Sequence, residues 1–133
     1  MPSFLDPLLD SPPDSYVLVD DRTGAIVARR LETAFDSATR NKGLLGRDSM
    51  PHEAALFIAP CNGVHTFFMR FPIDIVFARR DGRVVKVCHG VRPWRFALAP
   101  TAFATVELAA GAARTAGLQK DTRLRLDIRL HNR

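Results

Sequence analysis

The chain has 133 residues, of which 47% are hydrophobic and 25% are charged, and its formal net charge is +5. This length and composition predict a single globular domain with a core of its own. The basic residues are spread along the chain rather than gathered in one block, which disfavours a nucleic-acid-binding protein. No stretch approaches the ~20 apolar residues of a membrane span, and the N-terminus lacks the features of a secretory signal. We therefore expect a cytoplasmic protein without a membrane partner.

The first fifteen residues contain four prolines, so we expect an irregular or partly ordered arm at residues 1–15, whose apolar side chains could pack on the domain, in front of one β-rich domain at residues 16–133. Apolar and β-branched runs predict strands at residues 16–19, 26–28, 55–59, 64–69, 73–79, 83–88, 105–108 and 124–130. About seven short strands with one or two short helices predict a mainly β fold of the α+β type. Its architecture would be either a small β-barrel or packed sheets.

Two segments carry helix signals. Asp36 or Ser37 is placed to cap the start of a short helix, and Gly43 stands where such a helix would end. A second short helix or turn is expected at residues 111–118.

The clearest hairpin turns at residues 81–82, an Asp-Gly pair. A two-residue turn would place Asp74 opposite His89, whereas a turn with a bulge at Gly82 would place it opposite Cys88. Both registers give one well-packed apolar face, so the hydrophobic pattern leaves both open.

The stretch at residues 61–77 places polar side chains in the most apolar part of the chain. His65, Asp74 and Glu107 are candidate catalytic residues, because a carboxylate that orients an imidazole is a common acid–base pair. The alternative is a structural network in which these groups satisfy one another. For Asp74 we expect burial and at least two hydrogen bonds, from Arg70, His65, His89 or backbone amides near the corner at residues 71–72.

The two cysteines, Cys61 and Cys88, show no Cys-x-x-Cys spacing, and together with the histidines they match no usual pattern of metal ligands. We therefore expect neither a bound metal nor a cofactor. Cys61 lies four residues before His65, but it is interpreted as an inert buried thiol rather than as a nucleophile.

An apolar segment with a few polar groups is typical of the wall of a ligand pocket. The guanidinium groups of Arg47 and Arg70 would suit a carboxylate, sulfate or phosphate of a ligand. The alternative is that these arginines pair with acids of the protein itself. The aromatic and basic loop around Trp94, at residues 90–100, would either stack a sugar or base or cover an edge of the core. The residues expected to bind a ligand are Arg47, His65, Phe68, Met69, Arg70, Asp74, Trp94 and Glu107.

Five blocks occur in order along the chain: GLLGR at residues 43–47, LF at 56–57, HTFFMRFPIDIVF at 65–77, DGRVV at 81–85 and VELAAG at 106–111. Together they resemble the prokaryotic domain of unknown function 192, over roughly residues 31–126. The resemblance implies a small, β-rich single domain without an established biochemical activity. The chain departs from the family pattern at Ala54-Ala55, where Gly-Met is usual, at Phe68-Met69-Arg70, where Trp-Met-Lys is frequent, and at Lys120-Asp121, where a Gly-Asp turn is usual.

The leading hypothesis is that the protein binds a small anionic or sugar-like ligand in a pocket near His65 and Asp74. The alternative is a hydrolase-type enzyme that uses His65 with Asp74 or Glu107. Nucleic-acid binding is the least favoured, and would use the basic face formed by Arg79, Arg80, Arg83, Arg123, Arg125 and Arg129. The sequence leaves the choice between a binding protein and an enzyme open, as it does the oligomeric state.

Overall fold

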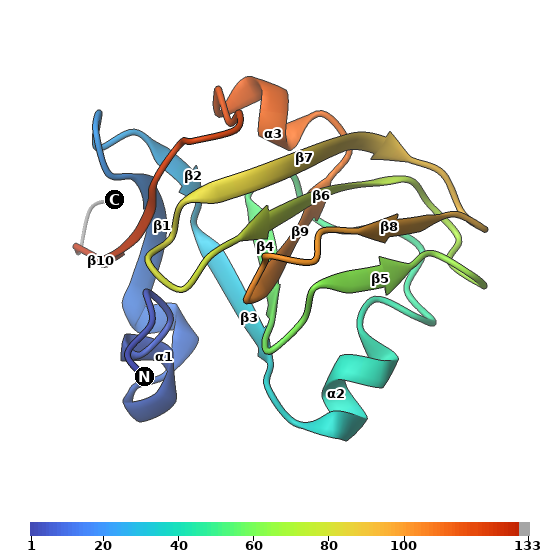
Figure 1. The fold of residues 1–133 in the computed structure, drawn as a ribbon, viewed down its shortest axis with the longest axis horizontal. Helices are drawn as coiled ribbons and strands as arrows, with labels where there is room; N and C mark the ends of the chain where they lie inside the picture. The colour runs from blue at the N-terminus through green and yellow to red at the C-terminus, as the bar shows by residue number, and fades with distance from the viewer. Residues whose placement is uncertain (131–133) are drawn as a thin grey trace.

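The computed structural model describes residues 1–130 and has a mainly β fold (Figure 1). Within these residues ten strands form three sheets. The strands are β1 (Tyr16–Asp20), β2 (Ile26–Ala28), β3 (Arg30–Ala34), β4 (Ala54–Ile58), β5 (Gly63–His65), β6 (Ile73–Ala78), β7 (Val84–Val91), β8 (Phe96–Leu98), β9 (Ala104–Ala109) and β10 (Leu124–Ile128). The helical elements are α1 (Pro7–Asp10), α2 (Ser37–Lys42), α3 (Ala112–Thr115) and the 3-10 turn η1 (Pro13–Ser15).

The central sheet has five strands in the order β3-β4-β9-β6-β7, with β3 and β4 parallel and the other pairs antiparallel. Strands β4, β6 and β9 are almost entirely buried, because their sequences are nearly continuous apolar runs. The prediction of packed sheets is confirmed. The barrel that was its alternative does not form, since the central sheet ends at two different edge strands.

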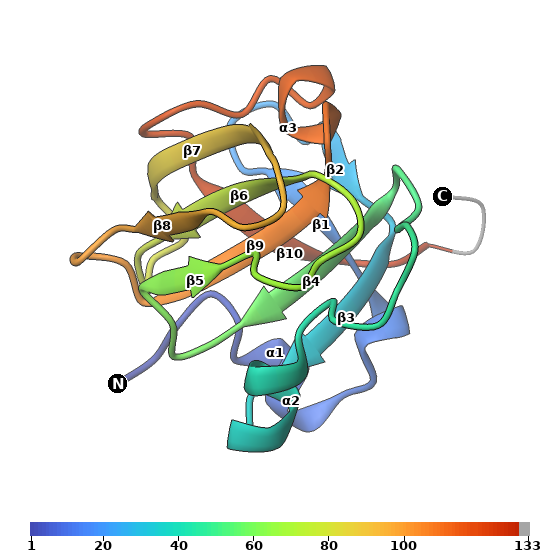
Figure 2. The ribbon, with the colours of Figure 1, turned by 90° about the vertical axis from the view of Figure 1, so that its right-hand side faces the viewer.

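Two apolar clusters cover the two faces of the central sheet. One contains Phe57 and Val106 and joins the sheet to β1, β2, β10 and the N-terminal segment. The other contains Phe77 and Leu56 and lies beneath the two-stranded sheet of β5 and β8 and the segment that follows α2. Figure 2 shows β5 and β8 in front of the central strands, with α2 below them. The candidate site lies on this second side.

The N-terminal segment is more ordered than an irregular arm. It contains α1 and η1, and its side chains Leu5 and Leu8 are buried in the first cluster. The Phe4 amide also donates a hydrogen bond to the carbonyl of Arg80 at 2.7 Å. The segment therefore packs on the domain as part of its core.

The hairpin of β6 and β7 combines the two registers that the sequence left open. Near its tip the amide of Arg79 bonds to the carbonyl of Arg83 at 2.9 Å and Gly82 has a φ of +89°, which fits the bulged turn. In the middle of the hairpin Val76 faces Val87, as the two-residue turn predicts. A bulge in between shifts the pairing by one residue, so each register holds over part of the hairpin. A second irregularity lies between Ile73, which faces Val91, and Ile75, which faces Cys88, so Asp74 is directly opposite neither His89 nor Cys88.

Two strands and one boundary differ from the sequence prediction. Strand β3 was not predicted, because Arg30, Glu32 and Thr33 give it a mixed pattern. Strand β8 lies in a segment that was expected to be a loop. The strand predicted at residues 64–69 ends at His65, and the segment that follows is a turn. Among the described residues, no helix has the length and hydrophobicity needed to span a membrane.

Candidate functional site

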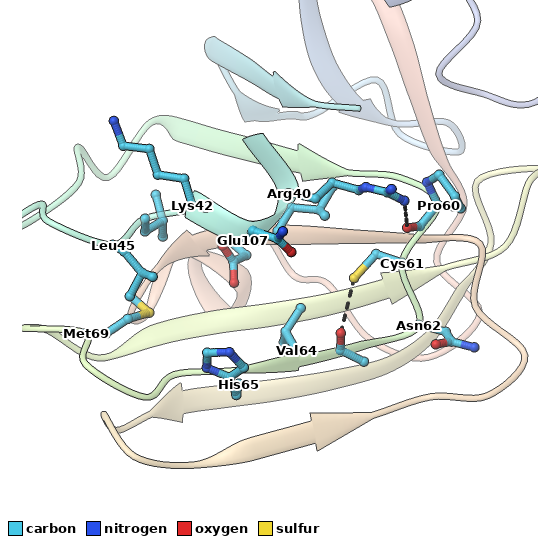
Figure 3. A pocket seen from close by; sticks show the side chains of 15 residues that line it. Arg40, Lys42, Leu45, Pro60, Cys61, Asn62, Val64, His65, Met69 and Glu107 are labelled. Carbon is cyan, nitrogen blue, oxygen red and sulfur yellow. Dashed lines mark hydrogen bonds between the residues drawn. The ribbon is translucent and has the colours of Figure 1, made fainter. Parts of the chain in front are cut away.

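A cavity of about 560 Å³ opens between α2 and the segment that leads from β4 into β5 (Figure 3). Its walls come from elements that are distant in sequence, and β9 contributes a single acidic side chain. The lining residues are Arg40, Asn41, Lys42, Gly43, Leu44, Leu45, Ile58, Pro60, Cys61, Asn62, Gly63, Val64, His65, Met69 and Glu107. The cavity therefore combines apolar side chains, two amides, two cations and one carboxyl group.

The helix α2 is held in place at both ends. Its N-cap is Asp36, whose carboxylate accepts a hydrogen bond from the Thr39 amide at 2.8 Å, and these bonds lower the pKa of Asp36. Gly43 ends the helix with a positive φ, and Leu44 is then buried in the second cluster. Arg40 crosses to the other wall and donates to the carbonyl of Pro60 at 3.1 Å. These contacts fix the cationic last turn of α2 at the cavity.

Glu107 is the most unusual side chain of the cavity. It lies on β9 between two central strands, opposite Leu56 on β4 and Ile75 on β6, and only 4% of it is exposed. Figure 3 shows its carboxyl group pointing into the cavity. None of the described residues donates a hydrogen bond to this carboxyl group. Burial raises its pKa to about 7, against an opposing effect of the nearby charge of Arg47.

Arg47 does not neutralise Glu107, because its guanidinium is engaged elsewhere. Its two terminal nitrogens donate to the two carboxylate oxygens of Glu32 on β3, at 2.8 and 2.9 Å. This bidentate pair lowers the pKa of Glu32 and raises that of Arg47. Arg47 thus acts on Glu107 only through space, and it is absent from the residues that line the cavity.

His65, the last residue of β5, and Met69, in the loop that follows β5, line the opposite wall of the cavity. The His65 side chain is exposed, and its Nδ1 accepts a hydrogen bond from the amide of Phe67 at 3.2 Å. Among the described residues, no carboxylate is bonded to His65. Cys61, also on this wall, is half-buried and its thiol donates to the Gly63 carbonyl at 3.3 Å.

Asp74 lies outside the cavity. Its side chain is fully buried, and its carboxylate accepts hydrogen bonds from the amides of Gly90 at 2.7 Å, Gly111 at 3.0 Å and Ala113 at 2.9 Å. The prediction of burial and at least two hydrogen bonds is confirmed. The donors are backbone amides, which the prediction included, but they come from Gly90, Gly111 and Ala113 rather than from the corner at residues 71–72, and they tie β6 to β7 and α3.

The eight residues that were expected to bind a ligand do not form one site. His65, Met69 and Glu107 meet at the cavity, whereas the other five lie elsewhere. Arg70 is ion-paired with Asp48 at 2.9 Å, and the rings of Phe68 and Trp94 lie against each other on the surface, with centroids 4.6 Å apart.

Sequence reasoning missed the contribution of α2 to the cavity. The cap and the closing glycine predicted the helix correctly, yet they carry no information on which wall it forms. Arg40 and Lys42 line the cavity because the chain after Gly43 enters the second cluster. This path brings the last turn of α2 close to Glu107 on β9. Within the described residues, no three His, Cys, Asp or Glu side chains come close enough to hold a metal ion, and His131 lies outside those residues.

The fold and the cavity define a small mainly β domain with a recessed, partly polar concavity at the end of its central sheet. The chain belongs to the family DUF192, described as an uncharacterised ACR, whose model matches residues 18–126. This confirms the resemblance seen in the sequence. No curated protein matches the chain.

Two solved structures share the fold. A protein of unknown function from Novosphingobium aromaticivorans is 21% identical, with a TM-score of 0.71, over 83% of this chain and 82% of that one. A protein from Sinorhizobium meliloti that has been named a candidate transcription regulator is 19% identical, with a TM-score of 0.71, over 84% of this chain and 91% of that one. At these identities the likeness shows the fold alone.

Proposed function

We propose that this protein binds a small sugar-like ligand, preferably one with an anionic group, in the cavity above Glu107. The observation that carries the proposal is the Glu107 side chain, which is 4% exposed, faces the cavity and accepts no hydrogen bond from the described residues. A carboxyl group whose pKa is raised by burial at the edge of a cavity is typical of functional sites. A ligand that fills the cavity would supply the missing partner.

Hydroxyl groups fit the chemistry of Glu107 better than a purely anionic or purely apolar ligand does. With a pKa of about 7, the carboxyl group is protonated in part of the molecules at neutral pH and ionised in the rest. A hydroxyl group both donates to a carboxylate and accepts from a carboxylic acid, so it suits either form. The amide of Asn62 adds a further polar partner on the cavity wall.

The preference for an anionic group rests on the cations of α2. Arg40 and Lys42 line the cavity, and Glu107 is the only acid among the lining residues. A sugar acid or a sugar phosphate would place its hydroxyl groups near Glu107 and its charge near the guanidinium of Arg40. The cavity volume of about 560 Å³ lies within the range of small-molecule sites.

The geometry gives the hydrolase and nucleic-acid alternatives less support. His65 lacks an orienting carboxylate among the described residues, and its Nδ1 is occupied by the amide of Phe67. On the proposed basic face, Arg123 pairs with Asp81 and Arg125 pairs with Asp21 and Asp127. These acids offset the charge of two of the six arginines of that face, which weakens its attraction for a phosphate backbone.

The proposal is tested by calorimetry with sugar acids, sugar phosphates and the corresponding neutral sugars. We expect binding by the wild type, with the anionic sugars stronger, and at least tenfold weaker binding by Glu107→Leu. Glu53→Gln is the control, because Glu53 is a surface acid paired with Arg30, far from the cavity lining. The proposal fails if none of these compounds binds, or if Glu107→Leu binds them as tightly as the wild type.

A further inference from the structure

Exposed large hydrophobic side chains gather at one part of the surface. Among the described residues nine such side chains are exposed, and five of them come from β8 and from the two loops beside it. Their exposed fractions are 38% for Phe67, 71% for Phe68, 56% for Trp94, 65% for Phe96 and 45% for Leu98. Single exposed apolar residues are ordinary, but a contiguous group of this kind marks an interaction surface.

The first four of these residues form what we call the aromatic tip. Phe67 and Phe68 lie in the loop between β5 and β6, and Trp94 lies in the loop between β7 and β8. In Figure 1 these two loops reach the right-hand end of the long axis of the molecule. Phe96 faces His65 across the β5–β8 pair, and Leu98 continues the apolar surface along β8 opposite Gly63. The tip is thus a projecting surface rather than the wall of a groove.

The fold holds the aromatic tip in its exposed conformation. Thr66 is fully buried between the two loops, and its hydroxyl donates to the carbonyl of Arg92 at 2.7 Å and accepts from the amide of Arg95 at 2.9 Å. Its carbonyl accepts a further bond from the Trp94 amide at 3.0 Å. Phe68 and Trp94 have φ values of 66° and 67°, which are unfavourable for residues with a side chain. Such backbone is kept where the surroundings enforce it, and it clusters at functional sites.

The chain around the tip is basic. Residues 61–73 and 82–106 contain no Asp or Glu, although the protein has 14 acidic residues in all. Arg92 and Arg95 flank Trp94, both are exposed, and neither is ion-paired among the described residues. Lys86 is also exposed on the neighbouring β7, where its ammonium group donates to the carbonyl of Leu98 at 2.9 Å. The aromatic tip therefore suits a partner that is both apolar and negatively charged.

We propose that the aromatic tip docks onto membrane surfaces that contain anionic lipids. Phe68, Trp94 and Phe96 would enter the boundary between headgroups and acyl chains, where aromatic side chains are favoured, while Arg92 and Arg95 meet the lipid phosphates. Stacking of nucleic-acid bases is less suited to this surface, because the rings already stack on one another: the Phe67 ring lies 4.8 Å from that of His65 and 5.9 Å from that of Trp94. The sequence-based expectation of no membrane partner considered only a spanning segment.

Trp94 reports on this docking directly, because it is the only tryptophan of the chain. The experiment mixes the protein with vesicles of phosphatidylcholine alone and with vesicles of equimolar phosphatidylcholine and phosphatidylglycerol. With the anionic vesicles we expect co-sedimentation, a blue shift of the Trp94 emission and quenching by brominated acyl chains, all weakened by salt. With phosphatidylcholine alone we expect at least a tenfold lower partition coefficient.

Two pairs of variants separate the apolar and the electrostatic contributions. Phe68→Asn with Phe96→Thr removes two rings but keeps Trp94, and Asn tolerates the positive φ while Thr suits a strand. We expect at least a tenfold loss of vesicle binding, whereas Leu9→Gln, at an exposed leucine of α1, leaves binding unchanged. Arg92→Glu with Arg95→Glu is also expected to lose at least tenfold, and Arg22→Glu with Arg114→Glu, which changes the net charge equally, much less.

Several outcomes would overturn the proposal. One is the absence of a blue shift with anionic vesicles at low salt, and another is an equal loss in a tip pair and its control. A blue shift with DNA or heparin in the absence of lipid would identify a general polyanion surface instead. A concentration-dependent dimer in which Trp94 already emits in the blue would show that a second copy of the chain covers the tip. Circular dichroism of each variant verifies that it is folded.

Discussion

Relative to the wild type, Glu107→Gln is expected to gain stability as the pH rises from 4.5 to 8. Burial raises the pKa of Glu107 from 4.5 to about 7 in the folded protein, whereas in the unfolded chain the pKa stays near 4.5. Between these pH values the folded state keeps a proton that the unfolded chain has released. The free energy of unfolding therefore falls as pH rises through this window and is constant above it.

The size of this loss follows from the two pKa values. A rise from 4.5 to about 7 corresponds to about 3 kcal/mol of stability, present below pH 4.5 and absent above pH 7. Glutamine keeps the shape of the side chain but does not titrate. The difference in unfolding free energy between Glu107→Gln and the wild type should therefore increase by about 3 kcal/mol from pH 4.5 to pH 8. Any constant cost of burying the amide shifts both ends of the curve equally.

Urea denaturation at a series of pH values measures this difference. Other titrating groups, including the four histidines, are present in both proteins and cancel in the comparison. Glu53→Gln serves as the control, because it makes the same chemical change at a surface acid that is paired with Arg30 and lies outside the cavity lining. A difference between Glu107→Gln and the wild type that stays constant from pH 5 to pH 8 would refute the reasoning. In that case Glu107 would be solvated, or paired, in the folded protein.

Three further changes test other parts of the structure. Asp74→Ala should lower the free energy of unfolding in urea by about 3 kcal/mol or more, because it leaves three backbone donors without an acceptor. Asp74→Asn should cost less, because the amide oxygen still accepts a hydrogen bond. A loss below about 1 kcal/mol for Asp74→Ala would argue against the network. Thr66→Val should lower the free energy of unfolding by about 1–3 kcal/mol and broaden the NMR signals of the Trp94 indole. Thr66→Ser, which keeps the hydroxyl group, should behave like the wild type. Sharp, unshifted Trp94 signals in Thr66→Val would show that the hydroxyl group does not fix the loops. Gly82→Ala should lower the free energy of unfolding by more than about 3 kcal/mol, since its Cβ would come within 2.2 Å of the Leu124 carbonyl oxygen. Gly24→Ala, also at positive φ but in open space, should cost only about 1 kcal/mol. Equal melting temperatures of these two variants would contradict the predicted clash with Leu124.

The parts of the fold that sequence reasoning captured have a local cause. The hairpin of β6 and β7 follows from two apolar runs around an Asp-Gly turn, and α2 follows from a cap at Asp36 and a glycine seven residues later. Strand β3 has no such signature, because its sequence is neither a continuous apolar run nor a regular alternation of polar and apolar residues, and it lies at the edge of the central sheet. The early end of β5 results from the loop around Thr66, whose partners lie about thirty residues further along the chain.

Two acids show that the sequence pattern predicts burial but does not predict hydrogen-bond partners. Asp74 and Glu107 each stand alone between apolar neighbours in a buried strand, and both attract attention in the sequence. Asp74 receives three amides because Gly90 of β7 and the start of α3 at Gly111 converge on it, while Glu107 receives none because its side chain faces a cavity. The local pattern is therefore informative about burial, and the tertiary arrangement of the loops decides which acid is satisfied.

The pairing of β1 with β10 has a consequence for how the protein folds. Asp20 pairs with Leu124 and Tyr16 with Ile128, so partners about a hundred residues apart complete the three-stranded sheet. At a synthesis rate of roughly 5–20 residues per second, β10 is synthesised several seconds or more after β1. The apolar side chains of β1 lack this partner strand during that time. Long-range pairing of this kind slows folding and leaves strand edges open in the meantime. Val17 and Val19, fully buried in the finished domain, therefore stay exposed in the nascent chain, where they can promote aggregation.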